Sequence, residues 1–186
     1  MPDIEDRKVS FCETLSAFDL DDLIVQCPNC TTFFAACCMH ASFGGNLRRN
    51  PDKSVCHHFQ LVFTDGACSN NGQGYAEAGL GIAIGDDELS WSIAVDDTID
   101  SGPRTSQRAE LLAAINGLKK LKEVHHFCLD KERERNPRKS AARHRASEKQ
   151  DYRATYIVVA DSEYVVKGIT EWFPVWRVRL PSCHSV

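Results

Sequence analysis

The sequence contains no run of about 20 consecutive apolar residues, the length that a membrane-spanning helix requires. Its longest apolar stretches, such as Tyr156–Ala160, have the length of a strand. The first seven residues carry three acidic side chains and no apolar segment, so we expect no secretory signal. These absences predict an intracellular protein of the nucleus or cytoplasm that is neither secreted nor bound to a membrane.

A large excess of one charge sign is also absent, because 22 basic residues stand against 26 acidic ones and the net charge is −4. This balance excludes a generally basic nucleic-acid binder. Residues 130–153 are the exception, with nine basic and five acidic side chains, and they predict a solvated insertion. Any contact with nucleic acid must therefore be local or use bridging cations. No internal repeat is present.

Nine cysteines are present, and without a secretory signal they indicate a reducing compartment, with free thiols or metal ligands rather than disulfides. Cys27 and Cys30 flank a Pro-Asn turn, and further Cys and His residues follow. Thiolate and imidazole are preferred zinc ligands, so Cys27, Cys30, Cys38 and His40 are a candidate Zn²⁺ site. The spacing fits no zinc-finger pattern well, and reduced structural cysteines are the alternative.

The chain divides into three zones: an irregular Cys/His-containing segment over 1–58, a patterned zone over 59–176, and an unpatterned tail over 177–186. In the patterned zone, apolar runs and turn residues predict four strands and two helices. The strands are expected over 59–65, 79–84, 89–95 and 155–161, with a turn at Gly66, and the helices over 105–121 and 162–172. In the first helix, Leu111, Ile115 and Leu118 recur at helical spacing and predict its apolar face.

This order predicts a mixed α+β fold in which strands one to three form an antiparallel meander. Strand four follows a helix and is expected to pair parallel to strand one. Asp65 ends strand one, Asp161 ends strand four, and Glu110 lies in the first turns of the first helix, so these carboxylates are expected to meet. Three adjacent carboxylates repel one another unless a cation neutralises them, which favours Mg²⁺ or Mn²⁺. Pairs of such ions serve in-line attack on a phosphodiester.

Three motifs occur in order on these elements: TDGACSNNG at 64–72, TSQRAEL at 105–111 and VADSEYVV at 159–166. Together they closely resemble type 1 ribonuclease H. The resemblance implies a ribonuclease H-like fold and a metal-dependent endonuclease that hydrolyses the RNA strand of RNA–DNA hybrids. It implies that Asp65, Glu110 and Asp161 are the catalytic metal ligands.

The resemblance also implies residues that bind the hybrid. Cys68 through its backbone, Asn71, Ser106 and Gln107 match positions that read the minor groove and sense 2′-hydroxyl groups, which distinguish RNA from DNA. Tyr164, Trp172 and Trp176 match a channel that grips the DNA strand. Core packing is the alternative for these aromatic side chains.

The sequence departs from the family after Trp176. Family members continue there with a helix, a fifth strand and a last helix that carries a fourth Asp, whereas ten residues without an acid follow here. We therefore expect the fifth strand and the last helix to be missing. The alternative function is a catalytically impaired nucleic-acid-binding protein of the same fold. An integrase-like transferase is disfavoured by the motif around Glu110 and by the single compact domain, which we expect to be a monomer.

Overall fold

The structure is a computed structural model that describes residues 8, 9, 11, 13–36, 57–135 and 155–173. Trp176, Cys38 and His40 lie outside the described residues, as do the 177–186 tail and most of the 130–153 insertion. Within the described part of the chain, no helix combines the length and apolar character needed to cross a membrane.

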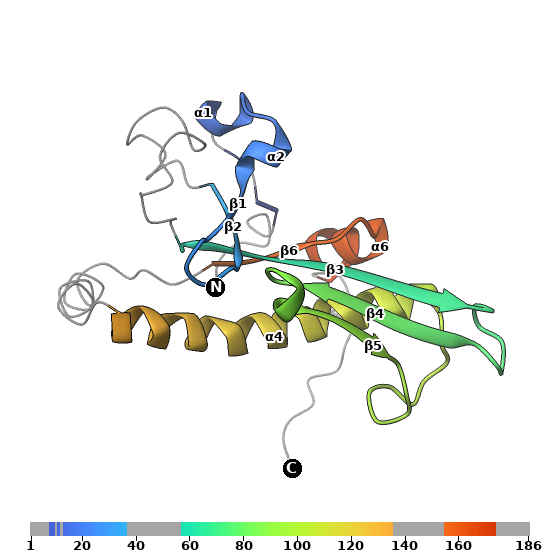
Figure 1. The fold of residues 1–186 in the computed structure, drawn as a ribbon. Helices are drawn as coiled ribbons and strands as arrows, with labels where there is room; N and C mark the ends of the chain where they lie inside the picture. Colours follow the sequence, from blue (N-terminus) through green and yellow to red (C-terminus); the bar gives the residue numbers. More distant parts are fainter. Residues whose placement is uncertain (1–7, 10, 12, 37–56, 136–154, 174–186) are drawn as a thin grey trace, which may run out of the picture.

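A mixed sheet of six strands forms the centre of the molecule (Figure 1). Its order is β1-β2-β3-β4-β5, and β6 pairs with β3. The strands are β1 Ile24–Gln26, β2 Phe33–Ala35, β3 Phe59–Ser69, β4 Glu77–Ala83, β5 Ser90–Ala94 and β6 Thr155–Val159. The β3-β4-β5 meander is antiparallel and β6 runs parallel to β3, which confirms the predicted fold class.

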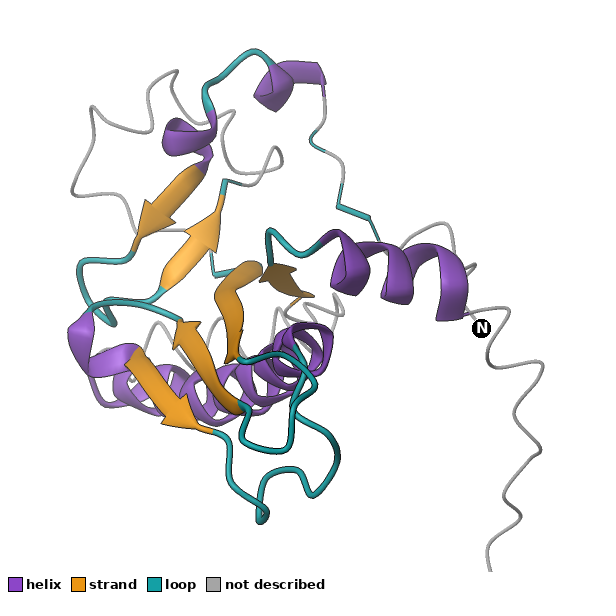
Figure 2. Cartoon of the chain, turned by 90° about the vertical axis from the view of Figure 1, so that its right-hand side faces the viewer, coloured by secondary structure: helices purple, strands orange, loops and turns teal. Residues whose placement is uncertain are grey.

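The described helices differ greatly in length. They are α1 Glu13–Ser16, α2 Leu20–Leu23, the 3₁₀ turn η2 Asp87–Leu89, α4 Ser106–Arg135, α6 Glu163–Lys167 and the π-helical segment η3 Gly168–Trp172. Figure 2 shows α4 lying along one side of the strands. It is longer than predicted and includes residues 130–135 of the expected insertion, where Lys, Glu and Arg are good helix formers.

The first part of α4 packs on the sheet through small residues, which the sequence pattern did not predict, and large buried side chains follow at Leu121 and Val124. Ala109, Ala113 and Gly117 are buried against the sheet, whereas Ile115 and Leu118 are 49 % and 36 % exposed. The predicted apolar face of this helix was therefore wrong at Ile115 and Leu118. Side chains without bulk allow the helix axis to approach the strands closely, and this approach decides which face is buried.

Gly66 is where strand and helix come closest. A Cβ atom on Gly66 would lie 2.2 Å from the backbone nitrogen of Glu110 and 2.6 Å from the carbonyl oxygen of Ala109. The predicted turn at Gly66 was wrong, because β3 continues through it to Ser69. The glycine is needed here for the close approach of α4.

The N-terminal part is more regular than the sequence suggested, because β1 and β2 form a hairpin that joins the sheet. Each strand has three residues, too few for an alternating pattern to be visible. Phe34 is in register with Gln60 of β3, and the backbone N–H of Phe33 donates to the carbonyl of Ile84 at 2.7 Å. The hairpin therefore continues the sheet beyond the point where β4 ends.

Candidate active site

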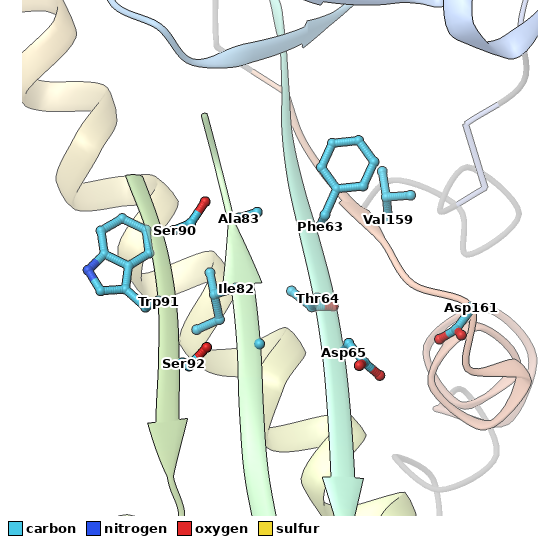
Figure 3. Close-up of a pocket in the computed structure, with 11 residues that line it drawn as sticks. Phe63, Thr64, Asp65, Ile82, Ala83, Ser90, Trp91, Ser92, Val159 and Asp161 are labelled. Carbon is cyan, nitrogen blue, oxygen red and sulfur yellow. The ribbon is translucent and has the colours of Figure 1, made fainter. Parts of the chain in front are cut away.

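Two aspartates meet because β3 and β6 are parallel. Their last registered pair is Phe63 with Val159, and Asp65 and Asp161 each follow two residues later. Residues at equal offsets from a parallel pair lie side by side on one face of the sheet. Figure 3 shows the two carboxyl groups pointing toward one another.

Glu110 completes the cluster from the second turn of α4. The contact between α4 and Gly66 brings it to β3, and a carboxylate oxygen from each of Asp65, Glu110 and Asp161 lies within 4.8 Å of the others. Asp65 and Asp161 are exposed, whereas Glu110 is partly buried. Its Oε2 atom is buried and has no hydrogen-bond partner among the described residues. The structure thus brings together the three acids singled out in the sequence.

The electrostatics of the cluster disfavour an ionised Glu110. Burial raises the pKa of the Glu110 carboxyl, and the nearby charges of Asp65 and Asp161 raise it further, while a backbone hydrogen bond with Gly66 acts in the opposite direction. A buried carboxylate oxygen without a partner is costly unless a cation or donor meets it. The donor set therefore fits a hard divalent cation such as Mg²⁺ or Mn²⁺.

We expect Glu110→Gln to raise the melting temperature of the metal-free protein at pH 7. The amide removes a repelled charge and can donate to the neighbouring carboxylates, a gain of up to about 1 kcal/mol for partly solvated charges. The pKa of Glu110 is raised in the folded state, so ionisation weakens folding above the unfolded value of 4.5. Below pH 4.5 both forms are neutral and the difference should vanish.

Thermal unfolding in EDTA at pH 7 and pH 4 measures this effect. Glu77→Gln, at an exposed position on β4, is the matched control and should leave the melting temperature unchanged. With Mg²⁺ added, the wild type should gain more stability than Glu110→Gln. A variant that is no more stable than the wild type in EDTA at pH 7 would contradict the repulsion.

The aspartates border a pocket on the face of the sheet opposite α4 (Figure 3). Strands β3 to β5, Val159 of β6 and Asp161 contribute to it. The lining residues are Phe63, Thr64, Asp65, Gly81, Ile82, Ala83, Ser90, Trp91, Ser92, Val159 and Asp161. Among the described residues, α4 covers only the other face, so the two aspartates are open to an approaching ligand.

Two of the predicted hybrid-reading residues are bound to each other. The side-chain oxygen of Asn71 accepts from the backbone N–H of Ser106 at 3.1 Å, which ties the turn after β3 to the start of α4. Gln107 follows as an exposed residue, and Cys68 lies near the end of β3, partly buried. These four residues therefore gather where β3 ends and α4 begins.

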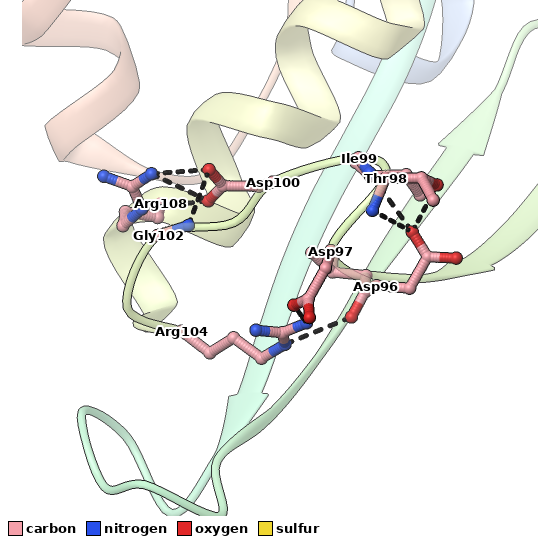
Figure 4. Close-up of polar contacts among 9 residues, drawn as sticks. Asp96, Asp97, Thr98, Ile99, Asp100, Gly102, Arg104 and Arg108 are labelled. Carbon is pink, nitrogen blue, oxygen red and sulfur yellow. Dashed lines mark hydrogen bonds and ion pairs between the residues drawn. The ribbon is translucent and has the colours of Figure 1, made fainter.

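Two arginines fix the segment that leads into α4 (Figure 4). Arg104 donates to Asp97 at 2.9 Å, and Arg108 makes a bidentate pair with Asp100, with a shortest contact of 2.6 Å. The hydrogen bond from Arg108 also holds the pKa of Asp100 below its usual value. The backbone carbonyl of Arg104 accepts from the N–H of Gly72 at 2.9 Å, so this network holds the turn as well.

The aromatic residues expected in a DNA-binding channel are partly described. The rings of Tyr164 and Trp172 lie edge to face, with centroids 5.5 Å apart. Both side chains are partly buried, on α6 and η3 respectively. The Ser162 hydroxyl accepts from the N–H of Val165, which caps α6 directly after Asp161.

A second cluster of possible metal ligands is formed by Cys27, Cys30 and His57, whose ligand atoms lie within 4.8 Å of one another. The zinc candidates named from the sequence shared the two cysteines but not the histidine. The pKa of the Cys27 thiol is raised to about 11, first by its hydrogen bond with Cys30 and second by burial. His57 comes close only because β2 pairs with β3, so no local spacing could have indicated it.

Comparison with known proteins finds similarity to ribonuclease H over part of the chain. Residues 58–131 match the family model for RNase H. A ribonuclease H of Pseudomonas paraeruginosa is 30 % identical over 119 residues, covering 64 % of this chain and 56 % of the relative. A ribonuclease HI of Pseudomonas aeruginosa is 29 % identical with the same coverage.

The chain thus spans about half the length of these curated relatives, 56 % in both cases. A solved structure, the foamy viral protease-reverse transcriptase in complex with dsDNA, aligns with a TM-score of 0.33 and 21 % identity. That alignment covers 64 % of this chain and 58 % of the viral one. The match of residues 58–131 to the family model and the similarity to the curated relatives support a ribonuclease H-like protein.

Proposed function

We propose that this protein is a metal-dependent endonuclease that hydrolyses the RNA strand of RNA–DNA hybrids. The observation that carries the proposal is the juxtaposition of Asp65, Glu110 and Asp161, with a buried Glu110 oxygen that has no hydrogen-bond partner in the described structure. The curated relatives are named ribonuclease H, which supports the reaction class.

Asp65, Glu110 and Asp161 would hold Mg²⁺ or Mn²⁺, which when bound supplies positive charge to a phosphodiester and activates water for attack. Asp65 and Asp161 present their carboxylates to the open face of the sheet, where the phosphate approaches. Without a cation, these carboxylates repel the phosphate, so a bound cation favours the approach of the substrate. Glu110 is held by α4 and fixes the position of the cluster beneath the phosphate.

The residues at the start of α4 would read the sugar of the RNA strand. Because the bond from Ser106 uses the oxygen of Asn71, the amide NH₂ of Asn71 is assigned the donor role toward the minor groove. Gln107 and the backbone of Cys68 would lie beside it along the same groove. The Tyr164 and Trp172 pair, which lies beyond Asp161, would contact the DNA strand.

The test is a cleavage assay with the purified chain and four substrates of one sequence: RNA–DNA hybrid, single-stranded RNA, double-stranded RNA and double-stranded DNA. We expect Mg²⁺-dependent cuts in the RNA strand of the hybrid alone, and none after chelation with EDTA. Equal cleavage of all substrates would contradict the hybrid specificity. Tight binding of the hybrid without any cleavage would contradict the enzymatic proposal and support a nucleic-acid-binding protein instead.

A further inference from the structure

The cluster of Cys27, Cys30 and His57 lies outside the carboxylate site and has no part in the proposed reaction. The Nε2 atom of His57 is 3.3 Å from the sulfur of Cys27, and neither cysteine is in a disulfide. Cys27 is 1 % exposed, although it sits in a short surface hairpin. Two sulfurs and one imidazole nitrogen in mutual reach are the donor set that zinc prefers.

The turn between the two cysteines directs backbone N–H groups at the Cys27 sulfur. The N–H of Thr31 donates to the carbonyl of Cys27 at 2.8 Å, and the N–H of Cys27 donates to the carbonyl of Thr32 at 3.0 Å. Thr31 has a φ of 58°, which closes the turn. The backbone N–H groups of Asn29 and Cys30 bond to the Cys27 sulfur. Successive N–H groups of this kind form a concave site that favours negative charge.

His57 is held in place from the other side. It lies directly ahead of β3, thirty residues from Cys27. Its ring stacks on Phe34 of β2, with centroids 4.3 Å apart and planes inclined by 7°. The ligand atoms therefore come from two segments, each fixed by its own contacts, and lie within 4.8 Å of one another.

The hairpin is short and is joined to β3 by one registered pair, Phe34 with Gln60, although Phe34 itself is fully buried. Its strands have three residues each, and an isolated hairpin of that size is marginal in water. The separate buried cluster of this region consists of Leu15, Leu23 and Ala36 among the described residues. Small units with so little core depend on a metal or another covalent link.

We propose that Cys27, Cys30 and His57 bind a zinc ion that fastens the β1–β2 hairpin to the start of β3. The three side chains supply three of the four positions that zinc usually occupies, and water or another ligand atom takes the fourth. Because β2 continues the sheet where β4 ends, the ion stabilises one end of β3. The same strand carries Asp65, but the zinc site itself takes no part in the reaction.

A redox role for the Cys27–Cys30 pair is less compatible with the geometry. Thiol–disulfide exchange requires an accessible attacking sulfur, and Cys27 is almost fully buried. A redox-active pair of cysteines also does not require the contact between His57 and the buried sulfur of Cys27. Both features are those of a structural metal site.

The test uses the full chain, purified without chelator and analysed for metal. We expect about one zinc ion per chain, as for a structural site. Cys30→Ser and His57→Gln should lose it, whereas Cys68→Ser and His58→Gln should retain it. Cys68 is a partly buried free thiol on β3, and His58 stacks on Phe59 directly beside His57, so both are matched controls.

Replacing zinc with Co²⁺ should give a thiolate-to-cobalt charge-transfer band, which reports sulfur ligands directly. Chelation of the wild type should speed hydrogen exchange of residues 24–36 by about tenfold or more, with little change in β4 and β5, and added zinc should reverse it. This measurement does not depend on variants that fold. Absence of zinc with no cobalt band, or equal zinc loss in the two controls, would overturn the proposal, whatever the outcome of the cleavage assay.

Discussion

Replacing Asp65 with asparagine is expected to abolish Mg²⁺-dependent cleavage of the RNA–DNA hybrid. The cleavage rate should fall by more than about 100-fold. A fall of about 100-fold is the most that is usual for a residue that only supports a metal ligand without binding the metal itself. Asparagine keeps the shape of the side chain but not its charge, so the cluster of Asp65, Glu110 and Asp161 loses an anionic ligand. Since the side chain is exposed, the fold should be unaffected.

The measurement compares the cleavage rates of the wild type and Asp65→Asn at saturating Mg²⁺, with hybrid affinity measured in Ca²⁺ or EDTA. Asp87→Asn, an exposed change of the same charge in η2, should cleave at the wild-type rate. Hybrid binding by Asp65→Asn should be unchanged or tighter, because one acid that repels phosphate is gone. Robust cleavage by Asp65→Asn would rule out the proposed mechanism.

The meeting of the carboxylates could be predicted because it depends on topology. A strand that follows a helix crossover pairs in parallel, and parallel strands end at the same edge of a sheet. The sequence therefore placed Asp65 beside Asp161 without knowledge of any contact. It also predicted a helix from residue 162, where Ser162 accepts a hydrogen bond from the first turn of α6, because residues of this type at a helix start have a local signature.

What could not be predicted depends on contacts between distant segments. The local sequence predicted a turn at Gly66, because no neighbouring residue in the sequence indicates that α4 lies against it. The buried face of α4 was misassigned for the same reason, since large side chains at Ile115 and Leu118 outweigh Ala and Gly in a hydrophobic pattern. His57 joined the cysteine cluster only through pairing of β2 with β3.

Replacing Gly66 with alanine is expected to destabilise the protein more than the same change at Gly79 or Gly81, the other glycines on the described strands. The new Cβ would lie 2.2 Å from the backbone nitrogen of Glu110, and neither the strand nor the helix backbone can rotate away as a side chain can. Overpacking of this kind costs about 1–3 kcal/mol and sometimes more. For a chain of this size, that lowers the melting temperature by about 2–4 °C for each kcal/mol.

The same change should also weaken the carboxylate site, because α4 must move away from β3 and carry Glu110 with it. We therefore expect Gly66→Ala to lose Mg²⁺-dependent stabilisation and hybrid cleavage together. Gly79→Ala on β4 is the matched control, since its Cβ would approach nothing closer than the Ile93 carbonyl oxygen at 3.8 Å. Thermal unfolding with and without Mg²⁺ measures both effects. If Gly66→Ala were as stable as Gly79→Ala, close packing of α4 on β3 would not be what positions Glu110.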